Sequence, residues 1–228
     1  MKFKIHPDNI SPLYVVIAGL FICFLMLSNI IVGRLVSVGG IVINGDFFLF
    51  PITYIFGDIL TEVYGFERTR LIIWLGFLVN IIMATYFFIV LRLPYPKEFV
   101  DNNAYMTVLG STPLIVFASI TAYFSGEFTN SITLSVMKKI TKGRWLWTRT
   151  IGSTIAGEAV DTTLFMGIVF FRALPFQVWL QIAVVQYLFK VGYEVVATPV
   201  TYLITNKIKR YERLNAFDYG VVYNPFKI

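Results

Sequence analysis

The sequence has few of the side chains on which most enzyme chemistry depends. It contains one cysteine, Cys23, and one histidine, His6, and the histidine precedes the first long apolar run. A single cysteine excludes an intrachain disulfide, and a single histidine outside the apolar runs excludes Ser-His-Asp, Cys-His and histidine-metal chemistry at a site within a membrane. A GxxxxGK(S/T) phosphate-binding loop is also absent, so ATP is not hydrolysed by that route. We therefore expect a protein that is not an enzyme and has no metal or cofactor.

Charged residues are scarce as well. Only 14% of the 228 residues are charged, 57% are hydrophobic, and the mean hydropathy is +0.73. A soluble domain of this length rarely has that balance, whereas it is typical of an integral membrane protein. The net charge of +6 does not indicate a nucleic-acid partner, because the basic residues gather in alternate loops.

Six apolar runs are long enough, or nearly so, to cross a hydrocarbon core of about 30 Å, which takes about 20 helical residues. The first resembles a signal peptide, but it is too long and no small-x-small cleavage site follows, so we interpret it as an uncleaved span. The sequence therefore predicts an all-α integral membrane protein with a single transmembrane domain over residues 1–228. The six expected helices are Leu13–Val32, Phe47–Tyr64, Leu71–Leu91, Leu114–Met137, Thr150–Phe170 and Trp179–Thr205.

The distribution of basic residues indicates the orientation. Most of the 19 lysines and arginines lie in the two termini, the second-to-third loop and the fourth-to-fifth loop, so the positive-inside rule places both termini in the cytoplasm. The densest basic patch, between Lys138 and Arg149, is interpreted as an orientation signal beside anionic lipid rather than as a nucleic-acid site. On the other side, Val38–Asp46 is expected to form a small hairpin. The loop Pro94–Pro113 is expected to contain a short surface helix over the mouth of the bundle.

Two motifs suggest an internal repeat of about 100 residues. GDILTE at Gly57–Glu62 returns as GEAVDT at Gly157–Thr162, and Asn29 has a counterpart in Asn130 at a similar offset. Each half, 13–92 and 113–205, then contains three spans, and an odd number inverts the second half relative to the first. A 3+3 inverted repeat is typical of transporters, which hold the substrate near mid-membrane between the halves.

Six of the 13 acidic residues fall inside the predicted spans. A charge near the bilayer centre costs at least about 2.5 kcal/mol on insertion scales and normally faces a polar interior or a cavity. Small residues such as Gly57, Gly126 and Gly157 lie beside these groups and leave room for such a cavity. Helical register places both members of each following pair on one face: Asp58 and Glu62, Glu127 and Asn130, Glu158 and Asp161, and Lys190 and Glu194.

Structural explanations for these groups stay open beside the functional one. They are an internal Lys190–Glu194 pair, a Glu62 that snorkels or pairs with Arg68 or Arg70, and an interhelical hydrogen bond from Glu127.

The polar groups favour binding over catalysis, because they include no clear pair of nucleophile and base. Carboxylates on separate helices suit either a cation or a polar organic solute. A carboxylate accepts hydrogen bonds from two adjacent N–H groups, such as those on the edge of an aminopyrimidinone ring. Asparagine or glutamine amides would complement a carbonyl, and the face of a tyrosine or phenylalanine ring would cover a flat solute.

Four segments together resemble one known family, the queuosine precursor transporter family, also called the vitamin uptake transporter family. They are FPITYIFGDILTEVYGFERTR, GSTPLIVFASITAYFSGEFTNS, LWTRTIGSTIAGEAVDTTLF and FKVGYEVVATPVTYLI, and the similarity extends from about Leu27 to Arg210.

The resemblance implies a six-helix, multi-pass protein of the bacterial inner membrane that imports 7-deazaguanine precursors of queuosine. The cargo would be the nitrile precursor, the aminomethyl precursor or the free base queuine. Substrate contacts are then expected first at Asp161 and Glu158, next at Lys190, and then at Asp58, Glu62, Glu127 and Asn130. Glu194, Tyr54 and Asn29 complete the expected substrate site.

A second class of function remains open at this point. A substrate-capture subunit of a multi-component ATP-driven vitamin importer would also be a small membrane protein without a nucleotide site, but it would need partner subunits. An ion channel fits the Lys190–Glu194 pair poorly, and a membrane protease lacks its catalytic pair. The sequence is compatible with a homodimer, and it does not decide between proton-coupled and facilitated transport.

Overall fold

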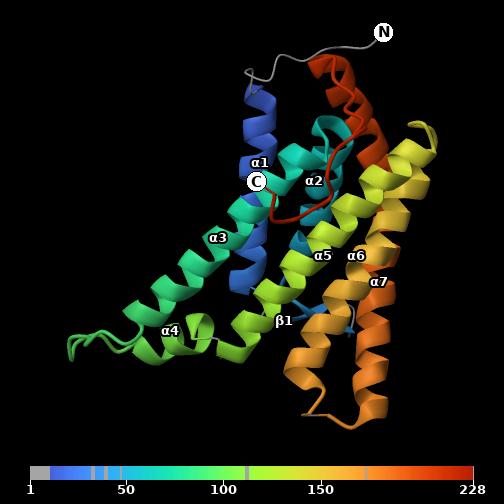
Figure 1. The fold of residues 1–228 in the computed structure, drawn as a ribbon. Helices are drawn as coiled ribbons and strands as arrows, with labels where there is room; N and C mark the ends of the chain where they lie inside the picture. The colour runs from blue at the N-terminus through green and yellow to red at the C-terminus, as the bar shows by residue number, and fades with distance from the viewer. Residues whose placement is uncertain are drawn as a thin grey trace.

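The computed structural model describes residues 11–31, 34–38, 41–46, 48–110, 113–172 and 174–227 (Figure 1). His6 and the expected position of the N-terminus lie outside these residues. The described part of the chain is mainly helical, with one short antiparallel pair of strands. The elements in order are α1 Pro12–Ile31, β1 Leu35–Val38, β2 Ile41–Asn44, α2 Leu49–Tyr64, α3 Phe66–Val90, α4 Asn102–Leu109, α5 Pro113–Ile140, α6 Leu146–Phe170 and α7 Phe176–Glu212.

A helix stands at each of the six predicted spans. Five regions are long and apolar enough to cross a membrane, and they contain α1, α3, α5, α6 and α7. The sixth helix, α2, has 16 residues, which corresponds to about 24 Å. Helix α7 continues to Glu212, beyond the predicted Thr205, because a helix does not end where its apolar run ends. The chain is therefore a multi-pass membrane protein.

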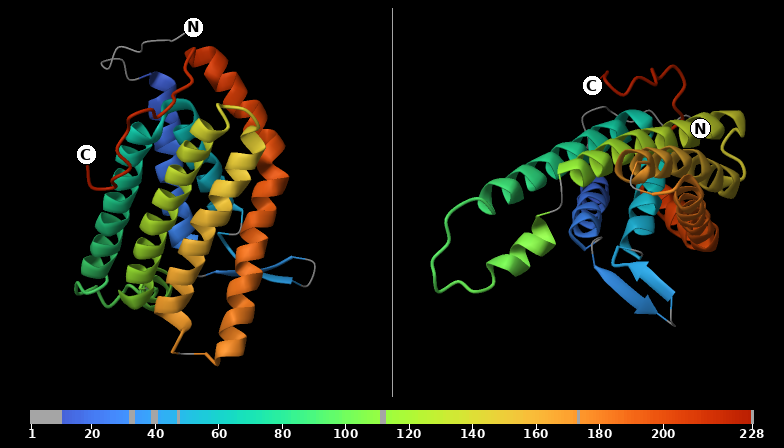
Figure 2. Two further views of the ribbon diagram at one scale, coloured as in Figure 1. Left: turned by 45° about the vertical axis from the view of Figure 1, so that its right-hand side comes forward. Right: turned by 90° about the horizontal axis from the view of Figure 1, so that it is seen from below.

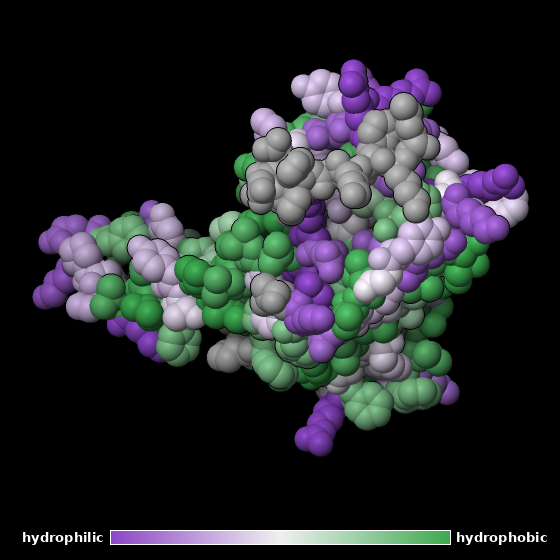
Figure 3. Space-filling view, turned by 45° about the horizontal axis from the view of Figure 1, so that its top comes forward, coloured by the Kyte–Doolittle hydropathy of each residue, from purple (hydrophilic) through white to green (hydrophobic). Residues whose placement is uncertain are grey.

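The two ends of the bundle differ in polarity. The start of α1, the α2–α3 turn, the α5–α6 loop and the end of α7 lie together at one end (Figures 1 and 2). Figure 3 brings this end toward the viewer, and hydrophilic side chains gather on it while apolar side chains dominate the flanks. The helix ends next to the basic loops therefore lie at the same end of the bundle, as the distribution of basic residues predicted. The compartment that each end faces stays a prediction.

The connections on the opposite side match the expected elements with changes in position. Strand β1 pairs with β2 from Leu35 opposite Asn44 to Val38 opposite Ile41, so the hairpin begins earlier than Val38. Residues 39 and 40, which join the strands, lie outside the described residues. The short helix α4 is present, but it has no buried residue and lies beside the bundle rather than across its mouth (Figure 2).

Close contact between α5 and α6 holds the second half together. A Cβ atom at Gly126 would lie 2.8 Å from the Cβ of Asp161, and one at Gly157 would lie 2.8 Å from the Cβ of Asn130. The two glycines thus let the helix backbones approach at the level of the buried polar residues. Small residues at a helix crossing have this role in membrane proteins generally, since packing rather than a hydrophobic driving force holds the helices together.

The first half packs around an apolar core instead. Phe21 of α1, Leu60 and Val63 of α2, and Phe66 and Ile73 of α3 are almost completely buried and belong to one cluster. This core fixes α2 against α1 and α3, so that the polar face of α2 turns toward the second half of the chain.

The glycine contact generates a stability prediction. Gly126→Val should lower the free energy of unfolding by about 1–3 kcal/mol, because the added side chain overpacks a rigid crossing. Gly19→Val is the matched control, since a Cβ at Gly19 has nothing within 4 Å. Denaturant titration in mixed micelles measures both variants, and an equal loss in the two would contradict the assigned crossing.

Candidate functional site

A buried ion cluster joins four helices at the polar end of the bundle. Arg149 of α6 donates from Nε to Oε2 of Glu62 and from Nη2 to Oε1, both at 2.7 Å. Lys138 of α5 lies 3.3 Å from the same carboxylate, and Lys209 of α7 also contacts it. We call Glu62, Lys138, Arg149 and Lys209 the Glu62 lock. Removing one member of a buried ion cluster leaves charge uncompensated, which costs several kcal/mol.

In the structure, Glu62 pairs with the residues of the Glu62 lock and not with Arg68 or Arg70. Arg68 and Arg70 follow Glu62 closely in the chain, but the Gly65 turn carries them onto α3. The Arg70 guanidinium donates to the carbonyls of Val222 and Asn224 instead, at 3.3 and 3.1 Å. Snorkelling is also wrong, because Glu62 is only 1% exposed and is held inside the bundle.

A second polar level lies deeper in the bundle. Five carboxylate side chains from four helices are at most 6% exposed there, and we call them the carboxylate layer. On α6, nine residues separate Arg149 of the lock from this level, a rise of about 14 Å. The carboxylate layer consists of Asp58 on α2, Glu127 on α5, Glu158 and Asp161 on α6, and Glu194 on α7.

Lys190 pairs across the α6–α7 interface. Its ammonium nitrogen lies 2.7 Å from Oδ2 of Asp161 and 2.8 Å from Oε2 of Glu158. Two carboxylates therefore share one lysine, and each keeps lone pairs for a further donor. The Tyr54 hydroxyl faces Glu158 from α2 and is also close to Gly126 of α5.

The other side of the layer contains acceptors without donors. The Asn130 amide donates to Oδ1 of Asp58 at 2.8 Å, and Thr61 of α2 donates to Ser131 of α5 at 3.2 Å. Oδ2 of Asp58 and one carboxylate oxygen each of Glu127 and Glu194 are buried and have no hydrogen-bond partner among the described residues. Buried acceptors of this kind are costly unless a proton or a ligand supplies a donor.

Asn29 does not share in this arrangement. Its amide donates to Oδ1 of Asn80 at 2.8 Å and to the Leu25 carbonyl at 3.0 Å, so its contacts join α1 to α3. Asn29 and Asn130 therefore differ in their contacts, because the Asn130 amide donates to a carboxylate and the Asn29 amide does not. The remaining predicted site residues lie in the carboxylate layer, beside it, or in the Glu62 lock.

Several buried polar residues near the carboxylate layer and the Glu62 lock are not among the residues predicted from the sequence. Thr198, Thr201 and Thr205 of α7 are buried and continue the face of Glu194 toward Lys209 of the lock. Their spacing of three and four residues is a helical-face signal that the sequence contains. Asp46, which precedes α2, accepts a hydrogen bond from Ser28 at 3.5 Å. Burial raises the pKa of Asp46, and the nearby charge of Lys190 opposes that effect.

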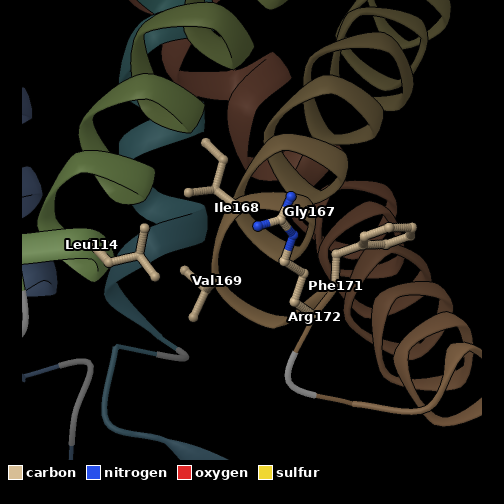
Figure 4. Close-up of a pocket in the computed structure, with 6 residues that line it drawn as sticks. All are labelled: Leu114, Gly167, Ile168, Val169, Phe171 and Arg172. Carbon is tan, nitrogen blue, oxygen red and sulfur yellow. The ribbon is translucent and has the colours of Figure 1, made fainter.

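A pocket opens at the end of α6 that is remote from the lock. It has a volume of about 480 Å³ and is lined by Leu114 of α5 and by residues 167–169, 171 and 172 (Figure 4). Ile168 continues the helical face of Asp161 about two turns farther on, and Arg172 follows just after α6 ends. A Cβ at Gly167 would have nothing within 4 Å, so this position leaves open space.

The residue types fit a solute better than a metal. In the described residues, no group of three or more His, Cys, Asp or Glu side chains is arranged to hold a metal ion. The chain instead offers carboxylate acceptors, one lysine, an amide and a tyrosine within a bundle of apolar helices. Buried polar side chains that run through a bundle of apolar helices are typical of multi-pass membrane proteins that move a solute or an ion.

Comparison with known proteins identifies the family. The family described as "Putative vitamin uptake transporter" matches residues 44–204, more than two thirds of the chain, and the protein belongs to it. It is a transporter family, so the expectation that the chain is not an enzyme is confirmed.

Two curated relatives agree with this family. The chain is 28% identical over 157 residues to the "Probable queuosine precursor transporter" of Bacillus subtilis (strain 168), covering 68% of this chain and 69% of the relative. It is 28% identical over 167 residues to the "Queuosine precursor transporter" of Escherichia coli (strain K12), covering 72% and 73%. These names do not favour a substrate-capture subunit. No solved structure matches the chain.

The Glu62 lock generates a second stability prediction. Arg149→Met should cost about 3 kcal/mol of unfolding free energy, because it leaves the buried Glu62 without its two-point partner. Arg144→Met is the control, since that side chain is exposed on the adjoining loop. Both are measured by the same micellar denaturant titration. A loss in Arg149→Met no larger than that in Arg144→Met would show that the ion cluster contributes little.

Proposed function

We propose that this protein imports a 7-deazaguanine precursor of queuosine across the bacterial inner membrane. The observation that carries the proposal is the carboxylate layer, in which four helices contribute buried acceptors and two of these acceptors share one lysine. The names of the two relatives suggest the class of cargo, and the chemistry of the carboxylate layer is complementary to it.

The ring edge of a 7-deazaguanine presents a ring N–H and an exocyclic amine side by side. A carboxylate accepts from two such donors at once, and a charge-assisted pair of this kind is stronger than a neutral one. Asp161 and Glu158 are assigned this role. Lys190 orients both carboxylates from α7, at 2.7 and 2.8 Å, and leaves their other lone pairs for the ring edge.

The remaining groups of the layer would complete the site. Asn130, already hydrogen-bonded to Asp58, would turn its amide toward the ring carbonyl. Tyr54 would cover the ring face beside Glu158. The unpartnered oxygen of Glu127 gives a further acceptor on the side of α5.

Import requires that the site open to one side at a time. We assign the pocket beside Gly167 to the outer approach and the Glu62 lock to the inner gate, with both termini in the cytoplasm. The two halves, 13–92 and 113–205, would move as inverted repeats about the carboxylate layer. In the described conformation the lock is closed, so this arrangement corresponds to the state before release into the cytoplasm.

Replacement of the acceptors tests the site. Asp161→Asn and Glu158→Gln should each weaken precursor binding about 10- to 100-fold, since each loses a charge-assisted hydrogen bond. Asp101→Asn, an identical change at an exposed residue, should have no effect. The readout is queuosine in tRNA of cells blocked in its synthesis and fed the precursor, together with binding to purified protein.

The controls separate the cargo from the site. A known importer expressed in the same cells must restore queuosine. If it does and this protein does not, the cargo assignment fails. If this protein restores queuosine and Asp161→Asn binds and transports like the parent, the cargo stands and the site is elsewhere.

The pocket gives a third kind of variant. Gly167→Trp should reduce uptake at least about tenfold by filling the outer approach, whereas Gly167→Ala should transport normally because the space beside it is open. Uptake of precursor into cells at equal membrane abundance measures both. Normal uptake by Gly167→Trp would place the approach elsewhere.

A further inference from the structure

The residues that follow α7 make further contacts with the bundle. Residues 214–227, which we call the strap, turn back across the polar end of the bundle as an extended segment (Figures 1 and 2). The reversal begins at Arg213, which has a φ of 53° and caps α7 with a bond to the Lys209 carbonyl.

The strap is fixed to the first half of the bundle by specific hydrogen bonds. Both carboxylate oxygens of Asp218 accept from the backbone N–H of Phe66, at 3.1 Å, where α3 begins. The Ala216 N–H donates to the Val63 carbonyl at 3.1 Å, and the Trp74 indole donates to the Pro225 carbonyl at 2.7 Å. A carboxylate at a helix N-terminus satisfies an otherwise free N–H and is favoured by the helix dipole.

The same segment is fixed to α5 in the second half. The Ser135 hydroxyl contacts Asp218, and it also lies 2.8 Å from the Tyr223 hydroxyl. The ammonium group of Lys139 lies 4.5 Å from the centre of the Tyr223 ring. Asp218, which is 8% exposed, is therefore a single buried carboxylate that joins the α2–α3 turn to α5.

The strap also touches the Glu62 lock. The Lys138 ammonium lies 4.9 Å from the centre of the Phe217 ring and donates to the Glu62 carbonyl. Phe217 packs against Gly143 in the α5–α6 loop, where a Cβ would come within 2.8 Å of the ring. The Lys138 ammonium group thus contacts both the strap and the Glu62 lock.

We propose that the strap is the closing element of the lock-side gate, and that Asp218 is the residue that holds it shut. Separation of α2 and α3 from α5 would open this end of the bundle, and the strap spans that seam at Asp218 and Tyr223. Its release therefore precedes or accompanies opening of the Glu62 lock. The inference concerns the gate alone and holds for any cargo.

A buried reporter on the seam tests the proposal. Ser131 of α5 is 0% exposed and lies between the lock and the carboxylate layer. In a Cys23→Ser background, Ser131→Cys is labelled by a small maleimide only when the gate opens. Asp218→Asn should label about tenfold faster than its parent, because it weakens a charge-assisted bond to two donors. Glu62→Gln serves as the reference for an opened lock.

Two controls distinguish a gate from a contact that stabilises the whole bundle. Asp101→Asn should leave the labelling rate unchanged, since that exposed side chain makes no cap bond. A second reporter, Ala118→Cys, is also 0% exposed but lies near the far end of α5, and its labelling should not change with Asp218→Asn.

The outcomes decide the proposal. Faster labelling at residue 131 alone supports it. Parent-like labelling at residue 131 in Asp218→Asn overturns it, and so does equal acceleration at residues 131 and 118, which would show loss of packing throughout. If Asp218→Asn does not fold, Tyr223→Phe removes a bond on the α5 side only, and its labelling is judged by the same criteria. No substrate is needed, so failure of the cargo assignment leaves this result unaffected.

Discussion

Charge inside an apolar bundle must find a partner, and this requirement organises the structure. At the polar end, Glu62 draws one basic side chain from each of α5, α6 and α7. Deeper in the bundle, Lys190 holds only two of five carboxylates. The first cluster is saturated with donors and the second is not. A saturated cluster is suited to holding helices together, whereas an undersaturated one is suited to receiving donors from outside the chain.

The helix α5 contacts the glycines of both acidic motifs, GDILTE and GEAVDT. Gly57 of GDILTE leaves space for Glu127, and Gly157 of GEAVDT leaves space for Asn130. One glycine comes from α2 and the other from α6, yet both accommodate the same face of α5. The polar residues of α5 therefore lie between α2 and α6, and small movements of either helix change their surroundings.

The sequence was sufficient for the spans and for most residues of the polar path, because hydropathy and helical register are local properties. It was not sufficient for their partners. Glu62 meets Arg149, 87 positions away, and Asn29 meets Asn80 rather than the carboxylate layer. The buried threonines on the Glu194 face of α7 share its helical spacing, but a threonine within an apolar run is a much weaker polar signal than a carboxylate. The strap has no periodic pattern, so only the folded chain shows where Asp218 lies.

The short length of α2 has a consequence for the electric field across the membrane. Sixteen residues extend about 24 Å, roughly 6 Å less than the hydrocarbon core. The longer helices α1, α5 and α7 pack against α2 and set the thickness that lipid meets. The apolar length that α2 contributes is thus shorter than that of its neighbours. A charge that crossed the membrane beside α2 would traverse less apolar thickness than one crossing through lipid, so the membrane potential would fall over a shorter distance there.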